Sequence, residues 1–187
     1  MKRWWLAPAA ALAAACASPA APHVPAVALQ STRGEVEQLP SNLKGARYTV
    51  LVFLSVDCPC FKAHEPRLAA LARDYGSKGV RFVLVDSERE SSGSRAARMS
   101  IEQNLALPLL LDPNAALADA LHAEYATYTV ILDREAVIRY RGGIDSDKSF
   151  LREDATPYLR DALDDLLAGV APRRPETEAL GCVLATR

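Results

Sequence analysis

The stretch TVLVFLSV at residues 49–56 constrains the fold more than any other part of the chain. It is almost wholly apolar and β-branched, with no alternation of apolar and polar positions. Such a run is typical of a strand that is covered on both faces, as in the middle of a parallel or mixed sheet. The rest of the chain must therefore supply cover for both sides of this strand.

The neighbouring segments alternate between helix-like and strand-like patterns. Apolar residues at helical spacing from Phe61 to Tyr75 predict a helix, and VRFVLVD at 80–86 predicts the next strand. We also expect strands at 27–29, 35–39, 127–133 and 136–142, helices at 95–104, 115–122 and 157–168, and an apolar segment, LPLLLD, at 107–112. Strands that alternate with helices predict an α/β domain with a mixed sheet.

Length and charge limit the classes of function. The chain has 187 residues, of which 50% are hydrophobic, enough for one sizeable core and short for two domains. Its 22 basic and 23 acidic side chains give a formal charge of −1, so no long-range field attracts nucleic acid. We expect one globular domain and no nucleic-acid partner.

The N-terminus has the layout of a secretory signal. Met1-Lys2-Arg3 is basic, and the uncharged run that follows ends in small residues around Cys16. The run is about a dozen residues, too short to span a bilayer as a helix. We expect a signal at 1–17, a spacer at 18–26, the folded domain at 27–170 and a Pro-rich C-terminal tail carrying Cys182 at 171–187.

Cys16 has two interpretations. The sequence LAAAC, residues 12–16, resembles a bacterial lipoprotein signal, with Ala13 where that pattern usually has Leu. Lipidation of Cys16 would tether the domain to a membrane; the alternative is ordinary cleavage after Ala15 or Ala17. Either interpretation places the domain in the periplasm or cell envelope, where disulfides persist.

Cys58 and Cys60 follow the end of the central strand, which is where chemistry gathers in open α/β sheets. Pro59 suits the first position of a helix and would place Cys58 at its N-cap. Free amides and the helix dipole there favour a thiolate, with a pKa of about 3.5 to 7.5. We expect Cys58 to be an ionised and accessible nucleophile; the simpler alternative is two buried cysteines that pack as small hydrophobes.

The segment LVFLSVDCPCFKAHEP, residues 51–66, resembles the active-site strand, turn and helix of the thioredoxin superfamily, in its redoxin or peroxiredoxin-like (AhpC/TSA) branch. The resemblance covers about residues 25–170, and Pro66 falls where thioredoxins have a helix-kinking proline. It implies a thioredoxin-like three-layer α/β sandwich with a mixed central sheet.

The resemblance also implies a thiol–disulfide oxidoreductase. Cys58 would attack a protein or small-molecule disulfide, and Cys60 or Cys182 would displace the mixed disulfide, without a cofactor. Cys182 follows the Pro-rich stretch APRRPETEA, which we expect to carry it away from the body of the domain. The alternatives for Cys182 are a bridge that pins the tail or an unpaired thiol.

The chain departs from the family pattern at several positions. Only one residue separates Cys58 from Cys60, so a disulfide between them would be strained and easily reduced. Val52 stands where thioredoxins keep a buried acid, which leaves Glu65 or His64 to transfer protons.

The peroxiredoxin pattern is matched only in part. Ser55 fits it, but Leu51 replaces a proline upstream of the cysteine. Thr127 stands where thioredoxins carry a cis-proline and peroxiredoxins an arginine. Weak peroxidase activity is therefore only an alternative activity of the same cysteine site.

A different class of function uses the cysteines as metal ligands. Cys60 and His64 are four residues apart on one face of the predicted helix, and with Cys58 they would supply two sulfurs and an imidazole. Such a set suits Cu(I) or Zn and loosely resembles the copper chaperones of oxidase assembly. The simpler interpretation of His64 is a solvated helix residue.

Overall fold

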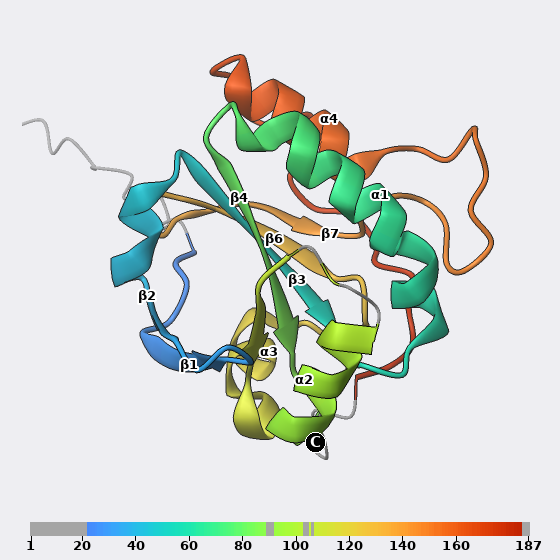
Figure 1. Ribbon diagram of the computed structural model, residues 1–187. Coiled ribbons are helices and arrows are strands. Elements are labelled where there is room, and N and C mark those ends of the chain that lie inside the picture. Colours follow the sequence, from blue (N-terminus) through green and yellow to red (C-terminus); the bar gives the residue numbers. More distant parts are fainter. Residues whose placement is uncertain (1–21, 89–91, 103–104, 106, 185–187) are drawn as a thin grey trace, which may run out of the picture.

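The computed structural model of the protein describes residues 22–88, 92–102, 105 and 107–184. These residues form a seven-stranded sheet with the order β2-β1-β5-β4-β3-β6-β7, and helices pack on it (Figure 1). The strands are β1 Val27–Ser31, β2 Val36–Leu39, β3 Tyr48–Leu54, β4 Val80–Asp86, β5 Leu109–Leu111, β6 Thr129–Asp133 and β7 Ile138–Gly142. The helices are α1 Pro59–Gly76, α2 Gly93–Glu102, α3 Ala116–Leu121 and α4 Tyr158–Leu167, with 3-10 turns η1 Ser41–Gly45 and η2 Pro113–Ala115.

Strand β3 lies between β4 and β6 and is the strand predicted to be covered on both faces. It runs parallel to β4 and antiparallel to β6, with Val52 opposite both Leu84 and Thr129. The side chains from Val50 to Leu54 are all buried. The sheet is therefore mixed, as predicted, and its middle strand is apolar from Val50 to Leu54 because both of its faces are covered.

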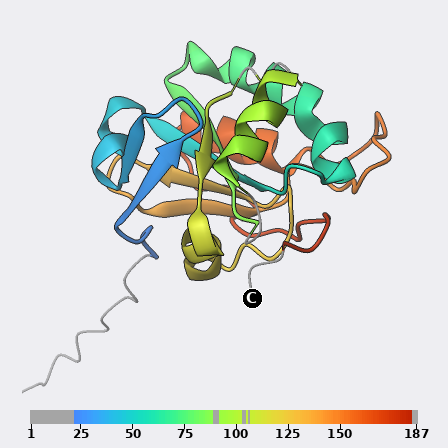
Figure 2. The same cartoon turned by 60° about the horizontal axis from the view of Figure 1, so that its bottom comes forward.

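The helices form the outer layers of the sandwich. The connections from β3 to β4 and from β4 to β5 step across the sheet in the same direction, so right-handed crossovers place α1 and α2 on the same face. Helix α4 packs beside α1, and the Tyr75 hydroxyl donates to Asp164 at 2.6 Å. Helix α3 lies on the opposite face (Figure 2). This arrangement confirms the predicted thioredoxin-like three-layer sandwich.

The strand-to-helix join differs slightly from the prediction. Strand β3 ends at Leu54, and a tight turn follows in which the Cys58 amide donates to the Ser55 carbonyl at 3.0 Å. Helix α1 then begins at Pro59, the position expected for its first residue, with Cys58 as its N-cap residue and Pro66 inside it. The predicted N-cap position of Cys58 is confirmed.

Part of the predicted spacer belongs to the packed domain. The Val24 amide donates to the Ala136 carbonyl at 3.0 Å, and the Ile138 amide donates to the Pro22 carbonyl at 2.9 Å. Val24 is buried as well. The spacer prediction is therefore wrong for residues 22–24, while the predicted signal with Cys16 lies outside the described residues.

The C-terminal segment packs on the domain along β7, contrary to the prediction that it leads Cys182 away. The Arg141 amide donates to the Pro175 carbonyl at 3.0 Å, and the Thr177 amide donates to the Arg141 carbonyl at 3.1 Å. Because β7 is an edge strand, its open backbone groups can accept this extended segment. None of the helices in the described part of the chain is both long and apolar enough to cross a lipid bilayer.

A buried charged cluster attaches α1 to the loop after β7. The Asp145 carboxylate lies 3.2 Å from His64 Nε2, and it accepts hydrogen bonds from Arg67 at 2.5 Å and from the Asp147 amide at 2.8 Å. Burial opposes ionisation of Asp145, but the bonds from His64, the Asp147 amide and Arg67 outweigh it and lower its pKa. The Asp145 carboxylate thus links α1 to the loop after β7, two segments that are far apart in sequence, by charged hydrogen bonds.

We predict that Asp145→Asn lowers the free energy of unfolding by about 2 to 4 kcal/mol at pH 7, because it removes the buried negative charge that pairs with Arg67 and contacts the buried His64 ring. A lowered folded-state pKa stabilises the fold above the unfolded pKa, and this contribution is lost as the pH falls through the folded-state pKa. The deficit of the variant should therefore shrink below about pH 4.

Urea unfolding at pH 7 and at pH 3 measures this effect. Asp154→Asn is the matched control, because the Asp154 side chain is 85% exposed and lies 4.0 Å from its partner Arg152. We expect the control to unfold like the unmodified protein. Equal losses of unfolding free energy in both variants, or a deficit in Asp145→Asn that is as large at pH 3 as at pH 7, would contradict the assignment.

Candidate active site

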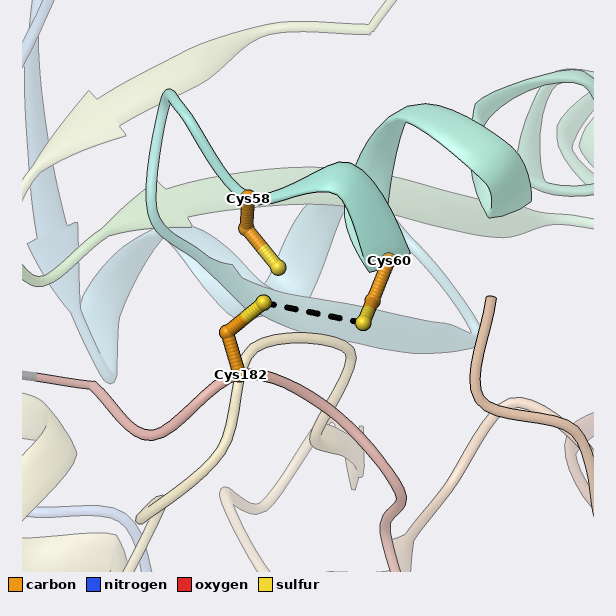
Figure 3. A group of neighbouring side chains, drawn as sticks. All are labelled: Cys58, Cys60 and Cys182. Atoms are coloured by element: carbon orange, nitrogen blue, oxygen red, sulfur yellow. Dashed lines mark hydrogen bonds between the residues drawn. The ribbon is translucent and has the colours of Figure 1, made fainter. Parts of the chain in front are cut away.

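Three cysteine side chains converge at the N-terminal end of α1. Cys58 is the N-cap residue, Cys60 lies in the first turn of α1, and Cys182 reaches them from the C-terminal segment (Figure 3). All three sulfurs lie within 4.8 Å of one another, and the Cys182 thiol donates to Cys60 Sγ at 3.6 Å. The structure therefore brings together all three of the cysteines that the sequence singled out as catalytic candidates.

All three described cysteines are free thiols. A disulfide requires a sulfur–sulfur separation of about 2.05 Å, so the sulfurs of Cys60 and Cys182 would have to approach by a further step of less than ~2 Å. The Cys58 thiol interacts with that of Cys182, and the Cys60 thiol with both, so each sulfur neighbours the other two. Disulfide exchange among the three sulfurs therefore needs only short movements.

An antiparallel backbone pairing holds Cys182 in this position. The Ala126 amide donates to the Cys182 carbonyl at 2.8 Å, and the Leu184 amide donates to the Glu124 carbonyl at 2.9 Å. Tyr125 and Val183 form the bridge between these two bonds. We call residues 180–184 the tail strap, because they cross the cysteine site and attach to the loop before β6.

Glycines allow the C-terminal segment to approach the domain so closely. A methyl group added to Gly181 would overlap the Ala126 carbonyl, and one added to Gly142 would overlap Thr177. A methyl group on Gly143 would lie 2.7 Å from the Glu178 carbonyl oxygen. These backbone contacts leave no room for a Cβ atom, and the sequence analysis did not consider them.

The tail strap covers the cysteine that was expected to be accessible. Cys58 is 3% exposed and Cys60 is 2% exposed, whereas Cys182 is half-buried. The expectation of an accessible Cys58 is therefore wrong for the state in which the strap is docked. Access of a substrate to the Cys58 sulfur therefore requires a local movement of the segments that bury it.

The thiols of Cys58 and Cys60 have raised pKa values. Burial raises the pKa of Cys58 most, and its hydrogen bond to Cys182 adds to this; the Phe61 amide acts in the opposite direction but does not compensate. Burial also raises the pKa of Cys60, and the thiol hydrogen bond from Cys182 and the charge of Lys148 offset part of the effect. The expected low pKa at the helix N-terminus is therefore wrong while the strap is docked, because desolvation outweighs the helix end.

His64 does not join the cysteines as a ligand. Its Nδ1 lies 2.8 Å from the Cys60 carbonyl oxygen and its Nε2 lies 3.2 Å from Asp145, and the side chain is 1% exposed. Both ring nitrogens face oxygen acceptors, so neither offers a lone pair to a metal. The interpretation of His64 as a solvated residue is wrong too, and Cys182 takes the place that His64 had in the predicted metal set.

Thr127 and Ser55, two positions that the sequence analysis compared with the family pattern, both form hydrogen bonds in the structure. Thr127 has a positive φ of 77°, its amide donates to the Phe53 carbonyl at 2.8 Å, and its hydroxyl donates to the Leu180 carbonyl at 3.3 Å. It thus links the central strand to the tail strap. The Ser55 hydroxyl donates to Glu88 at 2.7 Å and so is engaged by a carboxylate.

We predict that the alkylation rate of Cys58 in the reduced protein rises with pH and has its midpoint above about 8.5, the value for a free cysteine. The reason is that only the thiolate reacts and burial disfavours it. Iodoacetamide labelling followed by peptide mass spectrometry measures the rate, with urea-unfolded protein as the control. A midpoint below that of the unfolded protein would show that the helix end prevails over burial.

We predict that Gly181→Ala displaces the tail strap and increases the alkylation rate of Cys58 about 10-fold or more, which corresponds to a docking loss of about 1.4 kcal/mol. Gly45→Ala is the control, since a methyl group there meets nothing within 4 Å. Labelling of both variants at one pH, with circular dichroism to verify the fold, tests this. Equal rates in the two variants would refute the role assigned to Gly181.

Comparisons with known proteins agree with this architecture. A structure described as an uncharacterized conserved protein from Geobacillus kaustophilus is similar at 29% identity, with a TM-score of 0.79, over 89% of this chain and 91% of that one. A hypothetical protein from Sinorhizobium meliloti 1021 shares 22% identity and a TM-score of 0.79, over 91% of this chain and 96% of its own.

A structure named as a candidate thiol:disulfide interchange protein DsbE from Chlorobium tepidum shares the fold, with 18% identity, a TM-score of 0.60, and 80% of this chain and 95% of that chain covered. No curated protein matches the chain significantly. The model of the AhpC/TSA family matches residues 21–141, which include the whole of α1 and its two cysteines. The chain therefore belongs to the AhpC/TSA family, within the thioredoxin-like fold.

Proposed function

We propose that the protein is a thiol–disulfide oxidoreductase of the cell envelope that acts through Cys58 and a mixed disulfide. The observation that carries the proposal is the convergence of three free thiols within 4.8 Å of one another. Membership of the AhpC/TSA family and the fold shared with a candidate thiol:disulfide interchange protein support it. The substrates are protein or small-molecule disulfides.

The reaction proceeds by two exchanges. The Cys58 thiolate attacks one sulfur of the substrate disulfide, a mixed disulfide forms, and the first substrate thiolate leaves and takes up a proton. Cys182 then attacks the Cys58 sulfur, which releases the second substrate thiol and leaves a Cys58–Cys182 disulfide. Two protein thiols have lost two electrons to the substrate, and the same steps run in reverse oxidise a dithiol.

Cys60 allows the disulfide to move to a second pair of cysteines by thiol–disulfide exchange. Its sulfur lies 3.6 Å from that of Cys182, so attack by Cys60 on Cys182 moves the disulfide to Cys60–Cys182 and frees Cys58. A direct Cys58–Cys60 disulfide would close a strained ring across Pro59. The third cysteine thus allows the active-site thiol to be restored without that strained bond.

The tail strap must open before a bulky disulfide can reach Cys58. Two backbone hydrogen bonds hold its end, each worth about 1 kcal/mol net, and burial of Leu184 adds about 2 kcal/mol. The sum is a few kcal/mol, which is small enough for local opening without unfolding of the domain. Opening also exposes Cys58 to water, which removes the main cause of its raised pKa. The strap therefore controls both access and reactivity.

The envelope location is part of the same proposal. Its support is the basic start of the chain and the uncharged run that ends at Cys16. Lipidation of Cys16 would tether the domain to a membrane surface, while the thiol chemistry described above does not depend on the tether.

We predict that the reduced protein turns over a small disulfide, dithiobis(nitrobenzoate), and a protein disulfide such as that of insulin, with a thiol reductant present. Cys58→Ser should lower turnover about 100-fold or more, whereas Cys60→Ser should only change the rate. In the double variant Cys60→Ser/Cys182→Ser, treated with the disulfide after the reductant has been removed, no neighbouring site thiol is left to displace the substrate, so a mixed disulfide should accumulate at Cys58 and be detected by mass spectrometry.

Turnover that persists in Cys58→Ser, or an adduct mapped to another residue, would contradict the mechanism. Hydrogen peroxide in place of the disulfide is the comparison that tests the weak-peroxidase variant. A higher rate with peroxide than with either disulfide would reassign the physiological oxidant.

A further inference from the structure

The three thiols at the start of α1 also form a converging set of soft ligands. Each of Cys58, Cys60 and Cys182 points its sulfur toward the same small volume, and the three sulfurs lie within 4.8 Å of one another (Figure 3). The ligands come from two segments, the α1 N-terminus and the tail strap. The set is therefore complete only when the strap is docked.

The spacing of the sulfurs fits a metal ion in their plane. A metal–thiolate bond is about 2.3 Å long, as in Zn–S bonds, and three sulfurs at this distance around one ion are about 4.0 Å apart. The sulfurs of Cys60 and Cys182 are 3.6 Å apart, and no two of the three sulfurs are more than 4.8 Å apart. An ion can thus enter with changes of less than about 1 Å in the separations of the sulfurs.

The number of thiolate ligands and their softness indicate which metal ion the site can bind. Soft thiolates favour Cu(I) and Zn, but structural zinc is almost always four-coordinate. Among the described residues, the group of metal-ligating side chains at this site contains three cysteines and no fourth His, Cys, Asp or Glu. Both nitrogens of His64 face oxygen atoms, and the burial of Cys58 and Cys60 limits access of water as a fourth ligand.

The electrostatic surroundings suit a complex with an excess of negative charge. Three thiolates around a monovalent ion carry a net charge of −2. The Phe61 amide, in the first turn of α1, donates a hydrogen bond to Cys58, and the charge of Lys148 acts on Cys60. These groups offset part of the charge that burial would otherwise disfavour.

We propose that the reduced protein binds one Cu(I) ion through the thiolates of Cys58, Cys60 and Cys182. Binding replaces three thiol protons by one metal ion, so three protons are released and no electron is transferred. A disulfide between any two of these cysteines removes two ligands. The redox state of the site therefore decides whether it holds the ion.

An anaerobic titration of the reduced full-length chain with Cu(I) tests the proposal, with a Cu(I) chelator such as bathocuproine disulfonate as competitor. A Cys16→Ser background leaves only the three site cysteines. We expect one ion per chain, and X-ray absorption should show three sulfur neighbours at about 2.3 Å without the signature of an imidazole.

The variant Cys182→Ser should lower the affinity about 100-fold or more, since loss of a ligand costs at least as much as loss of a group that supports one. Protein oxidised to the disulfide beforehand should not bind. An affinity that is unchanged in Cys182→Ser, an imidazole in the X-ray absorption spectrum, or failure of the reduced protein to compete with the chelator would overturn the proposal.

The two functions can fail independently. Cu(I) binding is measured without a disulfide substrate, and disulfide turnover is measured with chelator in excess. A protein that binds Cu(I) but has no turnover would refute the oxidoreductase mechanism alone, and the reverse result would refute the metal site alone.

Discussion

The short antiparallel pairing between the tail strap and residues 124–126 is the interaction on which the site depends. It fixes the Cys182 backbone against Ala126 and so places a third sulfur 3.6 Å from that of Cys60. Without it, the domain would present two cysteines separated by one proline at a helix start. With it, the same two cysteines become buried members of a three-thiol cluster.

Burial and reactivity are opposed in this arrangement. The α1 N-terminus should favour a thiolate at Cys58, yet the docked strap removes the water that a thiolate needs, and desolvation raises the pKa instead. A site of this kind is protected from adventitious alkylation and oxidation while it is closed. In the mechanism that we propose, the site becomes reactive when the strap opens, at a cost of a few kcal/mol that is small beside the stability of a whole domain.

The sequence was sufficient for the fold because its strongest signals are local. The apolar run that became β3, the helical spacing of α1 and the prolines at 59 and 66 each follow from residues close together in the chain. The family resemblance rested on the same contiguous stretch, and the family match over residues 21–141 confirms it. The N-cap position of Cys58 was predictable for the same reason, since it requires only a strand end followed by a proline.

The parts that could not be predicted all depend on contacts between distant segments. His64 could have been solvated, a metal ligand or a proton donor; Asp145, 81 residues away, made it a buried partner in a charged cluster. The Pro-rich composition of 171–179 indicated a free tail, but the edge of β7 and the glycines at 142, 143 and 181 accept it at backbone contact. The sequence by itself therefore determined the sheet, the helix start and the cysteines at its end, because these follow from local periodicity. Only the tertiary structure decided which third thiol meets them and how deeply they are buried, because both depend on how closely two remote backbones can approach.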